Sequence, residues 1–266
     1  LRRYLRWMPG YHKTRRCASG LIIGSRTTLK QLPQKYHSKA VYIPENAIDP
    51  RLFPPRQTHR IEPPIKIASL GRLVPLKGTD MLLEACTELM RQGAVTLDII
   101  GDGPERSKLE AMAQANGVTD FVTFAGWIDH EQVNHQLCQA DLLGFPSIRE
   151  FGGGVALEAM ALGVVPLVID YGGPSELVTA DTGFRIPMQN RTALVQDIRK
   201  TLEAIVRDPQ CLLAMGQAAT QRVQKLFTWD RKARQVFEVY EWVLGDRGNK
   251  PDFGIPLQNQ TSDEDL

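Results

Sequence analysis

The sequence predicts an α/β fold built on a doubly wound parallel sheet, and three observations support this prediction. Short runs of apolar and β-branched residues alternate along the chain with segments of helical period. Several of these runs are almost continuously apolar, as in strands that helices cover on both faces. The 266 residues are 42% hydrophobic and 23% charged, which is ordinary for a globular protein with a sizeable core.

The predicted elements follow one another in a regular order. Strands are expected at residues 21–23, 41–43, 65–69, 96–100, 121–124, 142–145, 165–169 and 184–186. Helices are expected at residues 79–91, 105–115, 130–138 and 192–206. Residues 50–64 are polar, contain five prolines and lack any hydrophobic period, so they predict a linker between domains.

Charge is uneven along the chain although the net charge is only +2. Residues 1–16 contain six Lys and Arg and no acid. We interpret this basic segment as a solvated helix face; peripheral contact with an anionic membrane is the alternative, and no nucleic-acid partner is predicted. Residues 245–266 are rich in Gly and Pro and then polar and acidic, and they predict a disordered tail.

The four cysteines are scattered and form neither a CxxC pair nor a cluster with His. Neither a metal site nor a disulfide framework is therefore predicted, and the expected location is cytoplasmic. No secretory signal is recognisable, and the most apolar stretch, residues 155–169, is too short to span a bilayer. The basic segment is the only predicted route to a peripheral position at the inner face of a membrane.

Open parallel sheets bind ligands where strands end and loops enter helices. After the strand at 65–69, residues 71–78 read Gly-Arg-Leu-Val-Pro-Leu-Lys-Gly. Gly71 permits a tight turn, and Arg72 and Lys77 precede a helix whose positive end adds to their field. This pattern fits a pyrophosphate; the alternative is a capped helix start with two surface cations.

The next such loop reads Gly-Asp-Gly-Pro-Glu-Arg at residues 101–106 and begins like a dinucleotide fingerprint. Arg106 stands where the third glycine would be, so we interpret the loop as a turn that lines the pocket. Pro104 is expected to open the following helix. No NAD cofactor is predicted, and no other cofactor is.

The strongest signal lies at residues 149–155, which read Arg-Glu-Phe-Gly-Gly-Gly-Val. Three glycines between a strand and a helix let backbone N–H groups approach a ligand closely. Glu150 and Glu158 flank this cradle, a layout that fits the hydroxyls and the central diphosphate of a nucleotide-sugar. In the alternative interpretation, Glu158 only complements the helix dipole and Glu150 is solvated.

Together these motifs resemble the retaining glycosyltransferase family 4 (glycosyl transferases group 1), whose GT-B fold pairs two Rossmann-like domains. Glu150 and Glu158 enclose seven residues, as in the E-x7-E signature of that family. Four more motifs agree in order and spacing, at residues 43–49, 71–78, 101–104 and 124–127. The resemblance covers residues 20 to about 244, including a final helix at 229–244.

The resemblance implies a role for each matching residue. Arg72 and Lys77 match the cations that neutralise the leaving diphosphate, Glu150 the carboxylate that contacts the transferred sugar, and Glu158 the one that holds the ribose. The other donor-binding positions are Gly71, Gly103, Trp127, Ile128, Gly152, Gly153, Gly154 and Val155. The family usually has Phe where this chain has Gly152, so its sugar preference is in question. The family needs no metal.

The resemblance also implies how the chain is divided. Residues 1–60 match the end of an acceptor-binding domain plus the linker, 61–228 the donor-binding domain, and 229–244 a helix that crosses back. The rest of the acceptor domain would bind a sugar, lipid-linked or other acceptor. We therefore expect a hexosyltransferase-type chain that binds a UDP- or GDP-linked sugar and lacks turnover on its own.

Three hypotheses stay open: a glycosyltransferase donor domain, a non-catalytic nucleotide-sugar-binding module, and a dehydrogenase on a similar sheet. Gly152 keeps the second open, and the broken fingerprint at 101–106 argues against the third. The predicted sheet does not separate them, because parallel sheets carry many chemistries. The sequence specifies neither the base, nor the sugar, nor the acceptor.

Overall fold

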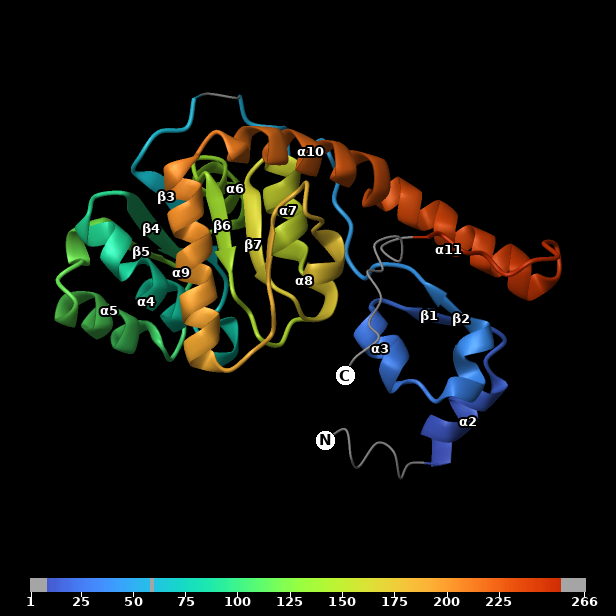
Figure 1. Cartoon of the computed structure of the whole chain (residues 1–266). Coiled ribbons are helices and arrows are strands. Elements are labelled where there is room, and N and C mark those ends of the chain that lie inside the picture. Colours follow the sequence, from blue (N-terminus) through green and yellow to red (C-terminus); the bar gives the residue numbers. More distant parts are fainter. Residues whose placement is uncertain (1–8, 58–59, 255–266) are drawn as a thin grey trace.

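The computed structural model describes residues 9–57 and 60–254 of the chain. Two parallel sheets form the core of the protein, and an extended segment and a long helix connect them (Figure 1). The smaller sheet has the order β1-β2, and the larger has the order β5-β4-β3-β6-β7-β8. The parts built on these sheets are called the smaller and the larger unit below.

All neighbouring strands of the larger sheet are parallel. The strands are β3 (Ile65–Leu70), β4 (Val95–Ile100), β5 (Val122–Gly126), β6 (Leu142–Phe145), β7 (Val165–Ile169) and β8 (Phe184–Ile186). β3 is central and pairs with both β4 and β6, so later strands are added first on one side of it and then on the other. The predicted α/β fold with a doubly wound parallel sheet is confirmed.

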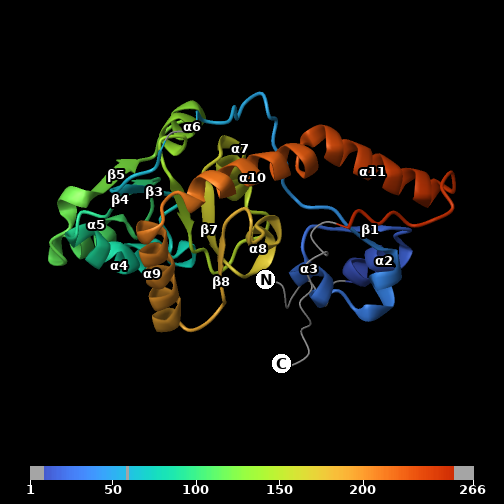
Figure 2. The same ribbon diagram turned by 45° about the horizontal axis from the view of Figure 1, so that its top comes forward.

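Helices cover both faces of the larger sheet (Figures 1 and 2). One face carries α4 (Thr79–Arg91), α5 (Arg106–Ala115) and α9 (Arg191–Arg207); the other carries α6 (His130–Leu137), α7 (Gly154–Leu162) and α10 (Cys211–Leu226). Successive side chains of a strand point to opposite faces, so Ile67 joins one buried cluster and Ala68 joins the other. This two-sided burial explains why the strands read as continuous apolar runs.

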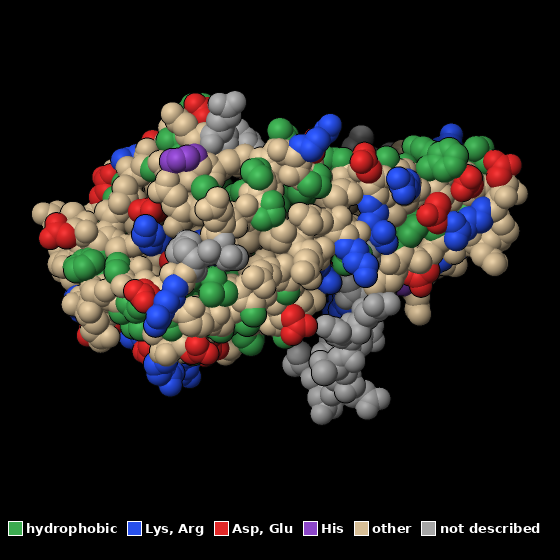
Figure 3. Space-filling view, turned by 90° about the horizontal axis from the view of Figure 1, so that it is seen from above, with side chains coloured by type: hydrophobic (Ala, Val, Ile, Leu, Met, Phe, Trp, Pro, Cys, Tyr) green, Lys and Arg blue, Asp and Glu red, His purple; other side chains and the backbone are tan. Residues whose placement is uncertain are grey.

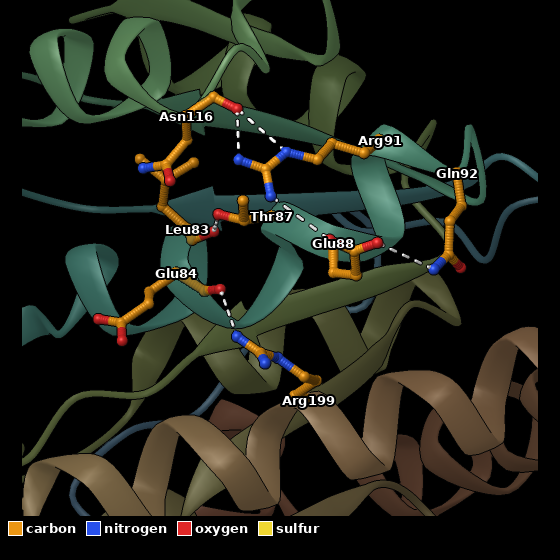
Figure 4. Close-up of polar contacts among 8 residues, drawn as sticks. All are labelled: Leu83, Glu84, Thr87, Glu88, Arg91, Gln92, Asn116 and Arg199. Atoms are coloured by element: carbon orange, nitrogen blue, oxygen red, sulfur yellow. Dashed lines mark hydrogen bonds and ion pairs between the residues drawn. The ribbon is translucent and has the colours of Figure 1, made fainter.

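Helix α4 is fixed to its neighbours by polar contacts (Figure 4). Near its end, Arg91 donates through Nε and Nη2 to the carbonyl of Asn116, at 3.2 and 2.8 Å. From α9, Arg199 donates to the carbonyl of Glu84 at 3.2 Å. Helix α4, which the loop at residues 71–78 enters, is therefore anchored to the rest of the larger unit.

The smaller unit precedes the linker in the sequence. It contains α2 (Pro9–Cys17), β1 (Leu21–Ile23), α3 (Arg26–Gln31), the 3₁₀-helix η1 (Gln34–Lys39) and β2 (Ala40–Tyr42). Ser25 caps α3, because its hydroxyl oxygen accepts a hydrogen bond from the backbone N–H of Thr28 at 3.1 Å. Two strands bury little on their own, and Ile22 remains 49% exposed.

The final helix, α11 (Trp229–Leu244), begins and ends at the predicted residues. It leaves the end of α10 and lies along the smaller unit (Figures 1 and 2). Its buried Val239 packs with Val41 and Ile43 in a small separate cluster. Thr228 caps the helix, and its side chain accepts from the N–H of Arg231 at 3.3 Å.

The two segments that join the units lie side by side. The N–H of Ile48, after the smaller unit, donates to the carbonyl of Phe227 at 2.9 Å. The N–H of Trp229 donates back to the carbonyl of Ile48 at 3.2 Å. The linker and the junction of α10 with α11 are thus hydrogen-bonded where both pass between the units.

Residues 245–254 differ from the prediction that a disordered tail begins at residue 245. Pro251 is buried, Phe253 packs with the Val41 cluster, and Lys250 Nζ donates to the carbonyl of Ala40 at 3.1 Å. The Gly and Pro residues of this segment shape a turn after α11, and its few apolar side chains find a surface there. Residues 255–266, and residues 1–8 of the basic segment, lie outside the described residues.

Candidate functional site

Three loops meet at the carboxyl edge of the larger sheet, after β3, β4 and β6. Their backbones are hydrogen-bonded to one another: Gly71 N to Ile100 O at 3.0 Å, Leu73 N to Asp102 O at 2.9 Å, and Ile148 N to Leu76 O at 3.0 Å. Parallel strands bring such loops together at one edge, which is the usual ligand position in open sheets. The candidate loops found in the sequence thus form one surface.

Close backbone approach explains the glycines of the second loop. Gly101 and Gly103 have φ angles of 135° and 158°, and a Cβ at either position would overlap a carbonyl oxygen of the first loop, that of Gly71 or Leu73. The expectation that Pro104 opens the next helix is wrong. α5 begins at Arg106, and Pro104 lies in the turn before it, because the N–H of Glu105 donates to the carbonyl of Leu73 at 3.1 Å.

An ion pair joins the first loop to the third. Lys77 Nζ lies 2.5 Å from Oε2 of Glu150, and the two side chains are only 27% and 21% exposed. The same Nζ lies 5.0 Å from the ring centroid of Phe145, at the end of β6. Lys77 is placed by the 3₁₀-helix η2 (Pro75–Lys77) just before α4. The fold therefore brings two predicted site residues into direct contact.

Arg72 lies in the same loop as Lys77 but is placed differently. Its side chain is exposed and forms no ion pair with any residue in the described part of the chain. A turn places it there, because the N–H of Val74 donates to the carbonyl of Arg72 at 2.9 Å. Its guanidinium is thus available to an anionic ligand.

The triple-glycine loop leads directly into α7. Gly153 is the N-cap residue with φ 67°, and a Cβ there would lie 2.9 Å from Cγ of Pro174. No side chain caps α7, and its first turn contains no acid. The backbone N–H groups and the positive dipole end of this helix therefore face the loop, as an anion requires.

The remaining predicted residues lie around this loop or at the end of the edge strand. Val155 and Glu158 lie in the first two turns of α7, and both are partly buried. Trp127 and Ile128 follow β5; Trp127 is 79% exposed. Of the three catalytic candidates, Lys77 and Glu150 form an ion pair with each other, at 2.5 Å.

Asn46 has no role in the sequence-based prediction, yet it lies against the glycine loop. A Cβ at Gly152 would overlap the Asn46 amide, and a Cβ at Gly154 would lie 3.6 Å from Nδ2 of Asn46. The preceding residue, Glu45, accepts a hydrogen bond at its carbonyl from Lys232 of α11. Two signals in the sequence could have indicated Asn46: the motif at residues 43–49, and Gly152 in place of the usual Phe. In the structure Gly152 lies beside that motif.

A buried carboxyl connects the larger unit to the smaller one. Glu176, on α8 (Gly172–Leu177), accepts from the N–H of Arg26 at 2.7 Å and from the hydroxyl of Tyr42. Burial raises the pKa of Glu176, and these hydrogen bonds oppose the rise. Burial, and then the nearby Glu176 carboxylate, raise the pKa of Tyr42 as well. Both side chains belong to the contact between the units.

Other classes of site are not evident in the part of the chain that the structure describes. Within residues 9–57 and 60–254, no group of three or more His, Cys, Asp or Glu residues is arranged to hold a metal ion. No helix in these ranges is both long and apolar enough to cross a membrane. Cys86 is fully buried, and burial raises the pKa of its thiol to about 12, so it is not a reactive thiol at neutral pH.

A doubly wound sheet with an uncapped helix start at its carboxyl edge is typical of proteins that bind nucleotides. Residues 54–222 match the family described as glycosyl transferases group 1. The chain belongs to this family, and the resemblance found in the sequence is confirmed at that level.

Individual relatives agree with this assignment. The chain is 29% identical over 180 residues to 2-deoxystreptamine glucosyltransferase of Streptomyces kanamyceticus, covering 67% of this chain and 46% of the relative. Sucrose-phosphate synthase from Thermosynechococcus elongatus has a TM-score of 0.68 and 27% identity, covering 85% of this chain and 58% of that one. Anabaena HepE, solved with UDP and glucose, has a TM-score of 0.72 and 21% identity, covering 89% and 66%. The chain spans about half the length of the curated relatives it matches.

Proposed function

We propose that this chain is the donor-binding part of a retaining glycosyltransferase, which moves a sugar from a nucleotide-sugar to an acceptor. Besides the family, one observation carries the proposal. The Lys77–Glu150 pair, with its 2.5 Å contact, lies between two loops of the carboxyl edge, next to the uncapped start of α7. A cation, a carboxylate and free backbone donors are the groups that a sugar diphosphate needs.

The proposed donor lies along this edge with its diphosphate in the middle. Arg72, Lys77 and the start of α7 hold the diphosphate, together with the backbone of Gly71, Gly103, Gly152, Gly153, Gly154 and Val155. Glu150 accepts a hydroxyl of the sugar, and Glu158 accepts the ribose hydroxyls. The base lies near Trp127 and Ile128. The UDP bound to Anabaena HepE supports a UDP-linked donor, and a GDP-linked donor is the other candidate.

The proposed chemistry follows from where charge develops. Cleavage of the bond between the anomeric carbon and the diphosphate leaves negative charge on the diphosphate. Arg72, Lys77 and the α7 dipole are positioned to stabilise that charge before the reaction begins, which is the main electrostatic route to catalysis. While the donor site is empty, Glu150 shields Lys77. A bound diphosphate would compete for Lys77 and release Glu150 toward the sugar.

The proposal divides the chain as the resemblance does. Residues 61–228 are the donor domain, residues 1–60 are the end of an acceptor domain plus linker, and residues 229–244 cross back. Two separate sheets support this division: one precedes the extended linker in the sequence, and the other follows it. The acceptor, whether a sugar or a lipid-linked molecule, would bind mainly to chain outside these 266 residues. Peripheral membrane contact through the basic segment remains part of the proposal.

A thermal-shift panel tests the proposal directly. UDP-, GDP- and ADP-sugars are each added to the chain, with NAD as the alternative ligand. A ligand at a hundred times its dissociation constant stabilises the fold by about 2.7 kcal/mol, which a melting curve detects. Stabilisation by NAD and by none of the nucleotide-sugars would reject the proposal in favour of a dehydrogenase.

A non-catalytic nucleotide-sugar-binding module is the second candidate, and the Gly152–Asn46 contact favours it. Asn46 fills space beside the position where the family usually has Phe. The two candidates differ in turnover and not in binding. Transfer assays on the chain joined to an N-terminal half separate them, because a binding module would remain inactive there.

A further inference from the structure

A second pocket lies at the junction of α10 and α11 and shares no residue with the candidate donor site. Its volume is about 430 Å³. Side chains that matter for its chemistry are Lys225, Asp230, Arg231, Arg234, Gln235 and Glu238. Lys225 lies at the end of α10, and the others lie in the first three turns of α11.

Positive charge dominates this pocket. Lys225, Arg231 and Arg234 form no ion pair with any residue in the described ranges. Of the two acids, Glu238 is already paired with Arg247. Asp230 is therefore the one lining acid that opposes the three cations. The space-filling view from above shows Lys and Arg side chains gathered over this part of the surface (Figure 3).

Gln235 adds a second, independent observation. The residue is only 4% exposed, and its Nε2 is buried with no hydrogen-bond partner in the described part of the protein. Buried amide donors are normally satisfied, so an orphaned one calls for a partner that is not a protein group. Gln235 lines the pocket next to Arg234 and one helical turn after Arg231. Nε2 itself is shielded from solvent, so an acceptor oxygen in the pocket would complete its hydrogen bonding once the amide turns toward it.

We infer that this pocket binds a phosphate-bearing molecule. Guanidinium groups match phosphate oxygens as planar forks, and a lysine adds a mobile charge. A phosphate offers more acceptor oxygens to these cations and the Gln235 amide than a single carboxylate does. The pocket spans the end of α10 and the start of α11, so its occupant would brace the place where the two units are joined. This inference does not depend on the proposed donor site.

Calorimetric titration with inorganic tripolyphosphate tests the inference. Arg72→Ala and Lys77→Ala are present in every sample, so that the candidate donor site does not compete for the probe. Arg231→Ala with Arg234→Ala should raise the dissociation constant about tenfold or more, since both remove charge-assisted hydrogen bonds. Arg207→Ala, at the exposed end of α9, is the matched control and should change it by less than about twofold. Equal losses in the two variants would overturn the inference.

A structural readout uses the orphaned amide itself. The Nε2 side-chain signals of Gln235 should shift when tripolyphosphate is added, and the shift should disappear in the Arg231/Arg234 variant. Unmoved Gln235 signals at saturation would overturn the inference even if the probe binds elsewhere.

Vesicles distinguish a soluble phosphate from a lipid headgroup. Phosphatidylglycerol vesicles are compared with phosphatidylcholine vesicles in co-sedimentation, again with both variants. Binding to the anionic vesicles that depends on Arg231 and Arg234 assigns the phosphate to lipid, whereas dependence seen only with tripolyphosphate assigns it to a solute. The inference fails if neither form of binding depends on these two residues.

Discussion

Lys77 lies where one cation can serve two anions in turn. Its ammonium contacts Glu150 at 2.5 Å. Lys77 also lies just before the start of α4, where the positive end of the helix dipole favours a second anion. Arg72, in the same loop, is exposed and has no such partner in the described residues. The two cations are therefore expected to contribute differently to binding, Arg72 as a free charge and Lys77 through exchange of partners.

Removing either cation should weaken the binding of nucleoside diphosphate. Arg72→Ala is expected to cost about 1.5–3 kcal/mol, as the loss of charge-assisted hydrogen bonds does, and Lys77→Ala is expected to cost less, because Lys77 gives up its contact with Glu150 on binding. The bare nucleoside should bind almost unchanged, because it lacks the phosphates. Calorimetry with UDP and uridine, or with GDP and guanosine, measures both. Equal losses for nucleoside and diphosphate would show that these residues support the fold and not the phosphates.

The two glutamates should act on different ends of the donor. Glu158→Gln is expected to weaken the binding of free nucleoside diphosphate, because the ribose is present with or without an attached sugar. Glu150→Gln should not weaken that binding, because it removes the carboxylate that competes with the diphosphate for Lys77, and it should reduce discrimination among donor sugars. Calorimetry with UDP and UDP-sugar, or the matching pair for the correct base, measures this. The assignment is wrong if Glu150→Gln weakens UDP as much as Glu158→Gln does.

Gly152 should be required because of Asn46. In Gly152→Ala the new methyl overlaps the Asn46 amide, so that side chain must shift, and overpacking of this kind costs up to about 3 kcal/mol. Gly154→Ala is the matched control, since its methyl would meet Asn46 at an ordinary 3.6 Å. Denaturant unfolding measures both. Adding Asn46→Ala to Gly152→Ala should restore most of the lost free energy of unfolding; no restoration would mean that another contact excludes the methyl.

At the scale of elements, strands and helices were predictable where burial is regular. The strand at 142–145 and the helix at 229–244 have the predicted bounds, because β6 is buried on both faces and α11 keeps a helical apolar period. The Asn46–Gly152 contact was not predictable, since it depends on how the linker folds back onto a loop about a hundred residues later. Pro104 was assigned wrongly because a bond from another loop decides where α5 begins.

The contact between α8 and the smaller unit should make stability depend on pH. Burial raises the pKa of Glu176 above its ordinary value of 4.5, so the folded state holds this proton more tightly than the unfolded state. The stabilisation is complete below the unfolded pKa and is lost as pH rises from there through the folded pKa. Relative to Glu176→Gln, the natural protein should thus lose stability as pH rises above about 4.5.

Urea unfolding between acid and neutral pH checks this expectation. The quantity of interest is the difference in unfolding free energy between the natural chain and Glu176→Gln at each pH. Glu203→Gln, an exposed residue of α9, controls for loss of a negative charge. Parallel curves for the natural chain and Glu176→Gln would show that Glu176 does not titrate differently on folding.

At the scale of the whole molecule, the smaller unit and α11 leave large apolar side chains exposed. On α11, Phe237, Tyr240 and Leu244 are 61%, 59% and 77% exposed. The smaller sheet has two strands, fewer than independent stability usually requires. Amide hydrogen exchange should therefore be faster in residues 9–57 and 229–254 than in the larger sheet. Uniform protection across both units would contradict this.

The isolated chain is expected to bind a donor without sustained transfer. Holding donor and acceptor together can supply about 7–11 kcal/mol of a barrier, and this chain offers the proposed donor wall alone. Radiolabelled transfer assays with and without an N-terminal half measure the difference. Multiple turnovers by the 266 residues alone would contradict the proposed division of labour.

The paired crossings near Ile48 set the mechanics of the molecule. Two covalent tethers join the units, and hydrogen bonds of 2.9 and 3.2 Å clamp them together at one point. Two tethers that are hydrogen-bonded in this way can act as a hinge. We expect them to permit a swing of the units toward or away from each other more readily than sliding or torsion. Such a swing would also have to break the contact of Glu176 with Arg26 and Tyr42.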